Sequence, residues 1–147
     1  MMADRVEGFI NGLITQTKNE KLEWHPFGLC KCKDSIYEEL ENGRGGFDYG
    51  LNSVRESASY FLESGDGYVF LFEIYHGDPD VTSPEMDTIG LMIKVNPYLP
   101  LENLTNYTVD EQKQLAILKI IIENQLDEKY ALPDAWYHFF DQVLGEV

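Results

Sequence analysis

Apolar and polar residues alternate along the chain with two different periods, and each period predicts a kind of secondary structure. At the start of the chain the period is that of a helix, about 3.6 residues. Segment 4–21 holds apolar residues at i, i+3, i+4, i+7 and i+8: Val6, Phe9, Ile10, Leu13 and Ile14. Because these side chains share one face, we predict an N-terminal helix that buries this face.

The middle of the chain has a period of two, which is typical of β-strands. Segment 57–77 is predicted to form a strand, a turn at 64–67 (SGDG) and a second strand, since Gly and Asp supply the positive φ values of hairpin turns. Both faces of the second strand, 68–75, are largely apolar, so we expect it to lie inside a sheet. Segment 88–96 is predicted to be a third strand.

The stretch from 21 to 56 carries weaker signals. Segment 21–27 is expected to form a short edge strand, because Pro26 cannot donate a hydrogen bond within a ladder. Residues 35–43 have the composition of a helix of about two turns that ends at Gly43. The glycine-rich segment 43–52 is predicted to be a flexible loop whose role the sequence leaves open.

Two helices are predicted in the C-terminal third. For helix 109–128, Thr108 is the expected N-cap and Glu111 completes a capping box. Apolar residues cover more than half of its circumference, so we expect it to be well buried. In the last helix, Pro133 suits the first helical position. One face of this helix is apolar: Trp136, Phe139, Phe140, Val143 and Leu144.

Strands grouped in the middle of the chain with helices at both ends indicate an α+β fold. The length of 147 residues favours a single domain over 1–147. We expect a central antiparallel sheet of about three to five strands. The N-terminal helix and the two C-terminal helices are expected to pack on this sheet, on one of its faces.

The charge of the chain is unusual. It has 26 acidic residues against 11 Lys and Arg, a net charge of −15, where a small soluble domain carries roughly 2 to 8 charges. Segment 56–93, called the acidic tract below, has no Lys or Arg and eight acids: Glu56, Glu63, Asp66, Glu73, Asp78, Asp80, Glu85 and Asp87. Because self-repulsion costs stability, an unpaired tract suggests a use. It also argues against direct binding to nucleic acid, which needs a basic surface.

Location follows from what the sequence lacks. No apolar run approaches the roughly 18 to 20 residues of a membrane span, so we expect no membrane partner. The N-terminus carries Asp4 and Glu7 and no long apolar stretch of the kind found in a signal peptide. We therefore expect a cytoplasmic protein.

Segment 76–87 (HGDPDVTSPEMD) is the most acidic part of the tract. A calcium loop needs alternating acids around a central Gly, but here no central Gly follows and two prolines stiffen the segment. A catalytic carboxylate pair would need a pocket and a raised pKa, and the candidates are Asp78 with Asp80 and Glu85 with Asp87. A solvated loop between strands is the simpler interpretation.

Cys30 and Cys32 (CKC) are the two cysteines of the chain. A structural zinc site normally uses two pairs at wider spacing, although His25 and His76 could complete a set. A disulfide across one residue would be strained, so reduced thiols without a bound cofactor are the simpler expectation. A Cys–His pair, Cys30 with His25 or His138, could serve as the catalytic pair of a small enzyme. No nucleophile elbow, phosphate loop or dinucleotide motif is present.

Two classes of function remain. We favour an interaction protein without enzymatic activity, whose carboxylate-rich face, formed by the eight acids of the tract, docks on a basic partner protein. In its sharpest form it is an inhibitor that mimics nucleic acid and blocks a nuclease or another nucleic-acid-binding protein. Small acidic anti-defence inhibitors of phages and mobile elements resemble the chain in charge and size alone. The alternative is a small metal- or Cys/His-dependent enzyme, or an ordinary regulatory or ligand-binding domain. The oligomeric state stays open.

Overall fold

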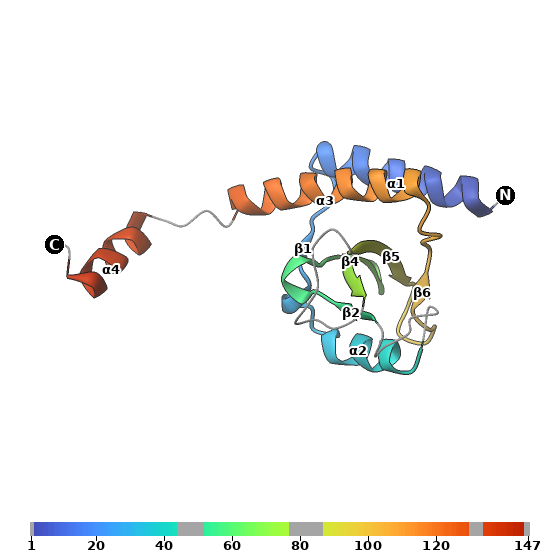
Figure 1. Cartoon of the computed structure of the whole chain (residues 1–147), viewed down its shortest axis with the longest axis horizontal. Helices are drawn as coiled ribbons and strands as arrows, with labels where there is room; N and C mark the ends of the chain where they lie inside the picture. Colours follow the sequence, from blue (N-terminus) through green and yellow to red (C-terminus); the bar gives the residue numbers. More distant parts are fainter. Residues whose placement is uncertain (1, 44–51, 77–86, 130–133, 146–147) are drawn as a thin grey trace.

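The computed structural model describes residues 2–43, 52–76, 87–129 and 134–145. These residues form four α-helices, six strands and two short 3₁₀ turns (Figure 1). The elements, in chain order, are α1 (Met2–Lys18), β1 (His25–Pro26), a turn at Phe27–Leu29, α2 (Lys33–Glu41), β2 (Asn52–Val54), a turn at Glu56–Ala58, β3 (Tyr60–Ser64), β4 (Gly67–His76), β5 (Thr88–Lys94), β6 (Glu102–Asn103), α3 (Val109–Lys129) and α4 (Asp134–Leu144).

The predicted α+β fold is confirmed. The strands form one antiparallel sheet in the order β1-β3-β4-β5-β6, and β2 pairs with the end of β4 beyond β3. The sheet has six strands, more than the three to five expected. The additional strands are very short: β1 and β6 have two residues each and β2 has three. Strands this short are below the length at which alternation is visible in a sequence. The expected flexible loop at 43–52 lies mostly outside the described residues.

The β3–β4 hairpin lies where the sequence predicts it. Ser64 pairs with Gly67 across a turn in which Gly65 has a φ of 60°, the positive value that a type II′ hairpin turn requires at this position. Gly67 is also required for space: a Cβ atom there would lie 2.5 Å from the backbone oxygens of Lys94 and Val95 on the neighbouring strand. The hairpin therefore depends on a glycine at both positions.

Alternate side chains of β4 enter two separate cores. Val69 and Leu71 pack in a core with α1 and α3, while Phe70 and Phe72 pack in the other with α2 and Phe27. Helices α1 and α3 cover one face of the sheet, as expected for these two helices, whereas α2 covers the other face, which was not expected (Figure 1). A strand that is apolar on both faces needs a cover on each side.

Helices α1 and α3 lie side by side and run in the same direction (Figure 1). The Gln125 side chain donates to the backbone oxygen of Thr17 over 2.7 Å, and the buried Thr17 hydroxyl accepts from the Trp24 indole over 3.0 Å. At the other end of α3, the predicted N-cap forms, with the Glu111 N–H donating to the Thr108 hydroxyl over 3.2 Å. The Glu111 carboxylate accepts from the N–H groups of Asn106 and Tyr107, so the second bond of a standard capping box is replaced.

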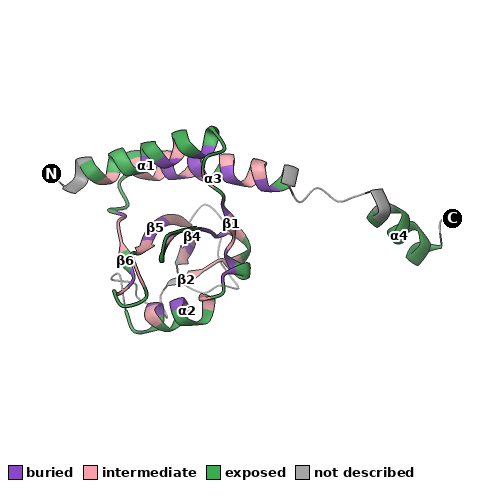
Figure 2. Ribbon diagram, turned by 180° about the vertical axis from the view of Figure 1, so that it is seen from behind, coloured by how far each residue is buried: buried purple, intermediate pink, exposed green. Residues whose placement is uncertain are grey.

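Helix α4 stands apart from the sheet (Figure 1). Every one of its side chains that the structure describes is exposed (Figure 2). Of the two C-terminal helices, therefore, α3 packs on the sheet as expected and α4 does not. None of the helices in the described part of the chain has the length and apolar character that crossing a bilayer requires.

Candidate functional site

The structure describes five of the eight acids of the tract and places them in different surroundings. Asp78, Asp80 and Glu85 lie outside the described residues. Of segment 76–87, the structure describes only the two ends: His76, which ends β4 and pairs with Asn52, and Asp87. The five described acids divide into three that form ion pairs and two that lie at the hairpin turn.

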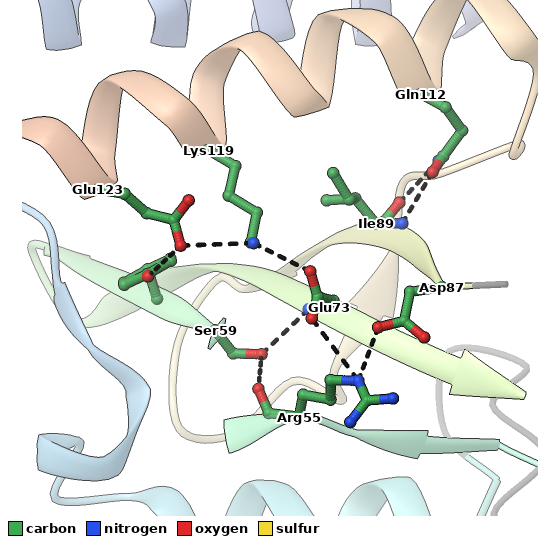
Figure 3. Close-up of polar contacts among 9 residues, drawn as sticks. Arg55, Ser59, Glu73, Asp87, Ile89, Gln112, Lys119 and Glu123 are labelled. Atoms are coloured by element: carbon green, nitrogen blue, oxygen red, sulfur yellow. Dashed lines mark hydrogen bonds and ion pairs between the residues drawn. The ribbon is translucent and has the colours of Figure 1, made fainter. Parts of the chain in front are cut away.

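Glu73 and Asp87 belong to a network of charges between the sheet and α3 (Figure 3). The Lys119 ammonium of α3 donates to Glu73 Oε1 over 2.9 Å, and Arg55 Nε donates to Asp87 Oδ2 over 2.6 Å. Arg55 Nε also lies 3.7 Å from Glu73 Oε2, and its guanidinium lies 4.3 Å from the ring centre of Tyr75. The Asp87 side chain is 6% exposed, so this carboxylate has little surface to offer to a partner.

The network continues toward β3. Lys119 lies 3.4 Å from Glu123, whose carboxylate accepts a 2.7 Å hydrogen bond from the Tyr60 hydroxyl (Figure 3). Burial, followed by this hydrogen bond to a carboxylate, raises the pKa of Tyr60 above its ordinary value of 10.0. Tyr60 is thus a neutral donor at physiological pH, and its role here is to hold α3 against the sheet.

Ser59 is the buried hydroxyl of this network, and its bonds exclude the role of a nucleophile in this conformation. Its hydroxyl donates to the backbone oxygen of Arg55 over 2.7 Å and accepts from the Glu73 N–H over 3.0 Å. An activated nucleophile instead donates its proton to a general base. Gln112 also fastens α3, because its amide exchanges two 2.8 Å bonds with the N–H and oxygen of Ile89.

The remaining described acids of the tract lie further away. Glu56 lies 3.0 Å from the Lys33 ammonium of α2, whereas Glu63 and Asp66 are exposed at the end of the β3–β4 hairpin. The tract was expected to be unpaired, and this expectation is wrong for three of its described acids. Glu56, Glu73 and Asp87 each have a basic partner. These basic partners are distant in sequence, so the spacing of charges within the tract does not predict the ion pairs.

Sequence reasoning missed a row of exposed carboxylates on α2. Asp34, Glu38 and Glu41 follow the spacing i, i+4 and i+7, and all three are exposed, opposite the buried Ile36 and Leu40. The signal was present in the helical period of the acids. The row lies outside the acidic tract, because α2 carries Lys33 and ends before residue 56.

The apolar face of α4 is the most exposed apolar surface on a single element of the described chain. Its five side chains are between 42% and 69% exposed: Trp136, Phe139, Phe140, Val143 and Leu144. The surrounding sequence, 130–147, has three acids, Asp134, Asp141 and Glu146, and no Lys or Arg. The spacing of apolar residues predicts this face, but we expected the sheet to cover it.

The thiol pair, Cys30 and Cys32, is brought together by the turn before α2. The two sulfurs lie 3.0 Å apart without a disulfide. Burial and the hydrogen bond to Cys32 raise the pKa of Cys30 to about 12. A cavity of about 190 Å³ beside Cys32 is also lined by Asp66, Tyr68 and Lys94. Among the residues that the structure describes, no group of three or more His, Cys, Asp and Glu side chains is placed to hold a metal ion.

The three histidines considered with these cysteines lie on different elements. His25 of β1 contacts the ring of Phe61, with centroids 5.5 Å apart. His76 ends β4 opposite Asn52, and His138 is exposed on α4. A hollow of about 450 Å³ at the end of α3 is lined by acids, Gln125 and apolar residues, with no His or Cys. No protein-family model, curated protein or solved structure matches the chain. Its function is therefore argued from the surfaces described above.

Proposed function

We propose that the chain is an interaction protein that inserts the apolar face of α4 into an apolar groove of a basic partner protein. The observation that carries this proposal is the exposure of that face, where Phe139 is 59%, Val143 67% and Leu144 69% exposed. Contiguous apolar surface of this kind is typical of sites where a partner binds. Its spacing is that of helices that bind in grooves through anchors at i, i+3, i+4 and i+7.

Burial of this face supplies the binding free energy. Each large apolar side chain that moves from water into a packed groove contributes about 1.5–3 kcal/mol. Trp136, Phe139 and Phe140 are aromatic, and aromatic residues commonly dominate the energetics of such interfaces. Part of this gain offsets the loss of translational and rotational freedom on association, so the contributions of the five side chains do not simply add.

Charge specifies the kind of partner. The 130–147 segment is acidic and without Lys or Arg, within a chain of net charge −15. A groove with basic residues around its rim complements this segment, and the charge of the whole chain attracts such a partner over longer distances. This attraction accelerates association and weakens as salt screens it.

A narrower form of the proposal is inhibition by mimicry of nucleic acid, with a nuclease or other nucleic-acid-binding protein as the partner. It is supported by the excess of acidic residues and by the exposure of Glu63 and Asp66 at the hairpin turn. The exposed carboxylates of α2, Asp34, Glu38 and Glu41, extend the set available for docking. Glu56, Glu73 and Asp87 serve this role less well because they are paired within the chain.

The test compares two double variants of α4 that carry the same added charge. Phe139→Asp with Val143→Asp disrupts the apolar face, whereas His138→Asp with Gln142→Asp changes exposed positions that do not belong to it. Affinity purification from the native host with mass spectrometry should recover a basic protein with the wild type and with the second variant but not with the first. Binding of that protein, once purified, should weaken steeply as the salt concentration rises.

Other outcomes contradict the proposal. Retention of the partner by the Phe139/Val143 variant would show that α4 is not the binding element. Light scattering could also show that the wild type is a dimer and the same variant a monomer. The apolar face would then bind a second copy of the chain instead. For the narrower form, nucleic acid should displace the purified protein from its partner, and failure to compete would remove mimicry while leaving the α4 interaction intact.

A further inference from the structure

The thiol pair is the feature of the structure that the proposed function leaves unused. Cys30 and Cys32 are separated by one residue, and their Sγ atoms lie 3.0 Å apart. Although a disulfide across one residue would be strained, sulfurs this close need only about 1 Å of further movement to reach its bond length, about 2.05 Å. They are held together by the turn between the 3₁₀ segment, which ends at Leu29, and α2, which begins at Lys33.

The two thiols are unequal in a way that suits exchange with an outside disulfide. Cys30 is buried, with 5% of its surface exposed, while Cys32 is partly exposed and borders the cavity of about 190 Å³. Cys32 is also the N-cap residue of α2, and its side chain makes no cap hydrogen bond there. An outside molecule thus reaches Cys32 first, and Cys30 lies behind it.

Charges around the cavity indicate which molecules can enter. Lys94 is bound to Glu39 over 2.9 Å and Lys33 to Glu56 over 3.0 Å, so these four charges compensate one another. Of the other charged residues that the structure describes here, Asp66 lines the cavity and the charge of Glu63 acts on Cys30. Both are exposed acids. A positively charged molecule is therefore favoured over a negatively charged one.

We propose that Cys30 and Cys32 form a redox-reactive dithiol that reduces positively charged disulfides by stoichiometric thiol–disulfide exchange. In the first step the Cys32 thiolate attacks one sulfur of the disulfide. A mixed disulfide forms, and the departing thiolate takes up a proton from water. In the second step Cys30 loses its proton and its sulfur attacks Cys32 Sγ, which releases the second thiol. Two electrons and two protons pass from the protein to the disulfide.

The order of attack follows from burial. Burial and the hydrogen bond to Cys32 raise the pKa of Cys30 to about 12 from 9.0, so only a very small fraction of this thiol is ionised at neutral pH. The greater nucleophilicity of a more basic thiolate recovers only part of this loss. Cys30 should therefore attack an outside disulfide at least about tenfold more slowly than an ordinary exposed cysteine. Its attack on Cys32 is intramolecular, and the short distance compensates for its low reactivity.

The experiment uses the full-length reduced protein and cystamine, a small disulfide with two positive charges, followed by mass spectrometry of the intact chain. The wild type should lose the mass of two hydrogens, and digestion should place the new bond between Cys30 and Cys32. Cys30→Ser should stop at an adduct of one cysteamine on Cys32. Cys32→Ser should react at least about tenfold more slowly than Cys30→Ser, since only the buried thiol remains.

Two results would overturn the proposal: a wild type that accumulates adducts without an internal disulfide, or equal rates for the two single variants. The wild-type measurement decides the first point even if a serine variant does not fold. Oxidised glutathione, which is negatively charged, should react more slowly than cystamine. The double variant Glu63→Gln with Asp66→Asn should reduce the difference between the two reaction rates. A faster reaction with glutathione disulfide would refute the assigned charge preference. None of these outcomes depends on α4.

Discussion

Replacing Glu73 with glutamine removes the carboxylate that joins α3 to the sheet while leaving a side chain of the same shape. Its Oε1 accepts from Lys119 over 2.9 Å, and the two side chains are 21% and 15% exposed. Hydrogen bonds to charged groups contribute about 1.5–3 kcal/mol, and breaking a fully buried pair costs about 3–5 kcal/mol. The lower range applies because Lys119 keeps Glu123 at 3.4 Å.

We therefore expect Glu73→Gln to lower the free energy of unfolding by about 1.5–3 kcal/mol. For a chain of this size, each kcal/mol corresponds to about 2–4 °C, so the melting temperature should fall by about 3–12 °C. Urea unfolding followed by far-UV circular dichroism measures the change. A double-mutant cycle with Lys119→Met should yield a coupling energy of about 1 kcal/mol or more.

Asp66→Asn is the matched control, because it removes the same charge from an exposed position in the hairpin turn. Both variants relieve the self-repulsion of the chain by one charge, so their difference isolates the local role of Glu73. The control should remain within about 0.5 kcal/mol of the wild type. If Glu73→Gln were as stable as Asp66→Asn, the conclusion that this acid belongs to the internal structure would be wrong.

Three further predictions concern the same framework and use the same unfolding assay. Leu71→Ala and Phe72→Ala should each lower the free energy of unfolding by about 2–5 kcal/mol, because both side chains are fully buried on opposite faces of β4; a small effect for either would contradict the two-sided core. Thr108→Ala should cost about 1 kcal/mol through loss of the N-cap bond of α3, and an unchanged stability would argue against that cap. Since the pKa of Tyr60 is raised above 10.0 on folding, its contribution is complete below pH 10.0 and is lost as the pH rises toward the higher folded-state value. Wild type should therefore lose more stability than Tyr60→Phe between pH about 8 and about 11, and parallel losses would refute the burial of this hydroxyl.

Elements with a clear period were predictable from the sequence because the signal for each lies within a few neighbouring residues. The hairpin at 64–67 and the cap at Thr108 are local patterns, and both formed. Strand β2 was not foreseen, since its three residues have too few positions to show alternation. It forms because the end of β4 extends beyond β3 and offers unpaired backbone groups.

The ion pairs could not be predicted for a different reason. Lys119 and Glu73 are 46 residues apart, and Arg55 and Asp87 are 32 apart. No local pattern specifies which base meets which acid, because that depends on how α3 lies on the sheet. For the same reason, the acidic tract was expected to be an unpaired surface, whereas the structure pairs three of its five described acids.

The sequence by itself determined the order of the longer elements, the α+β class and the two apolar faces of β4, because these depend on the spacing of residues along the chain. Tertiary structure alone decided that helices cover both faces of the sheet, that Glu73 and Asp87 face inward, and that the thiol pair lies beside a cavity. It also decided that the apolar face of α4 stays exposed. An amphipathic pattern records that one side of a helix avoids water, but what covers that side depends on the packing of the whole chain or of a partner.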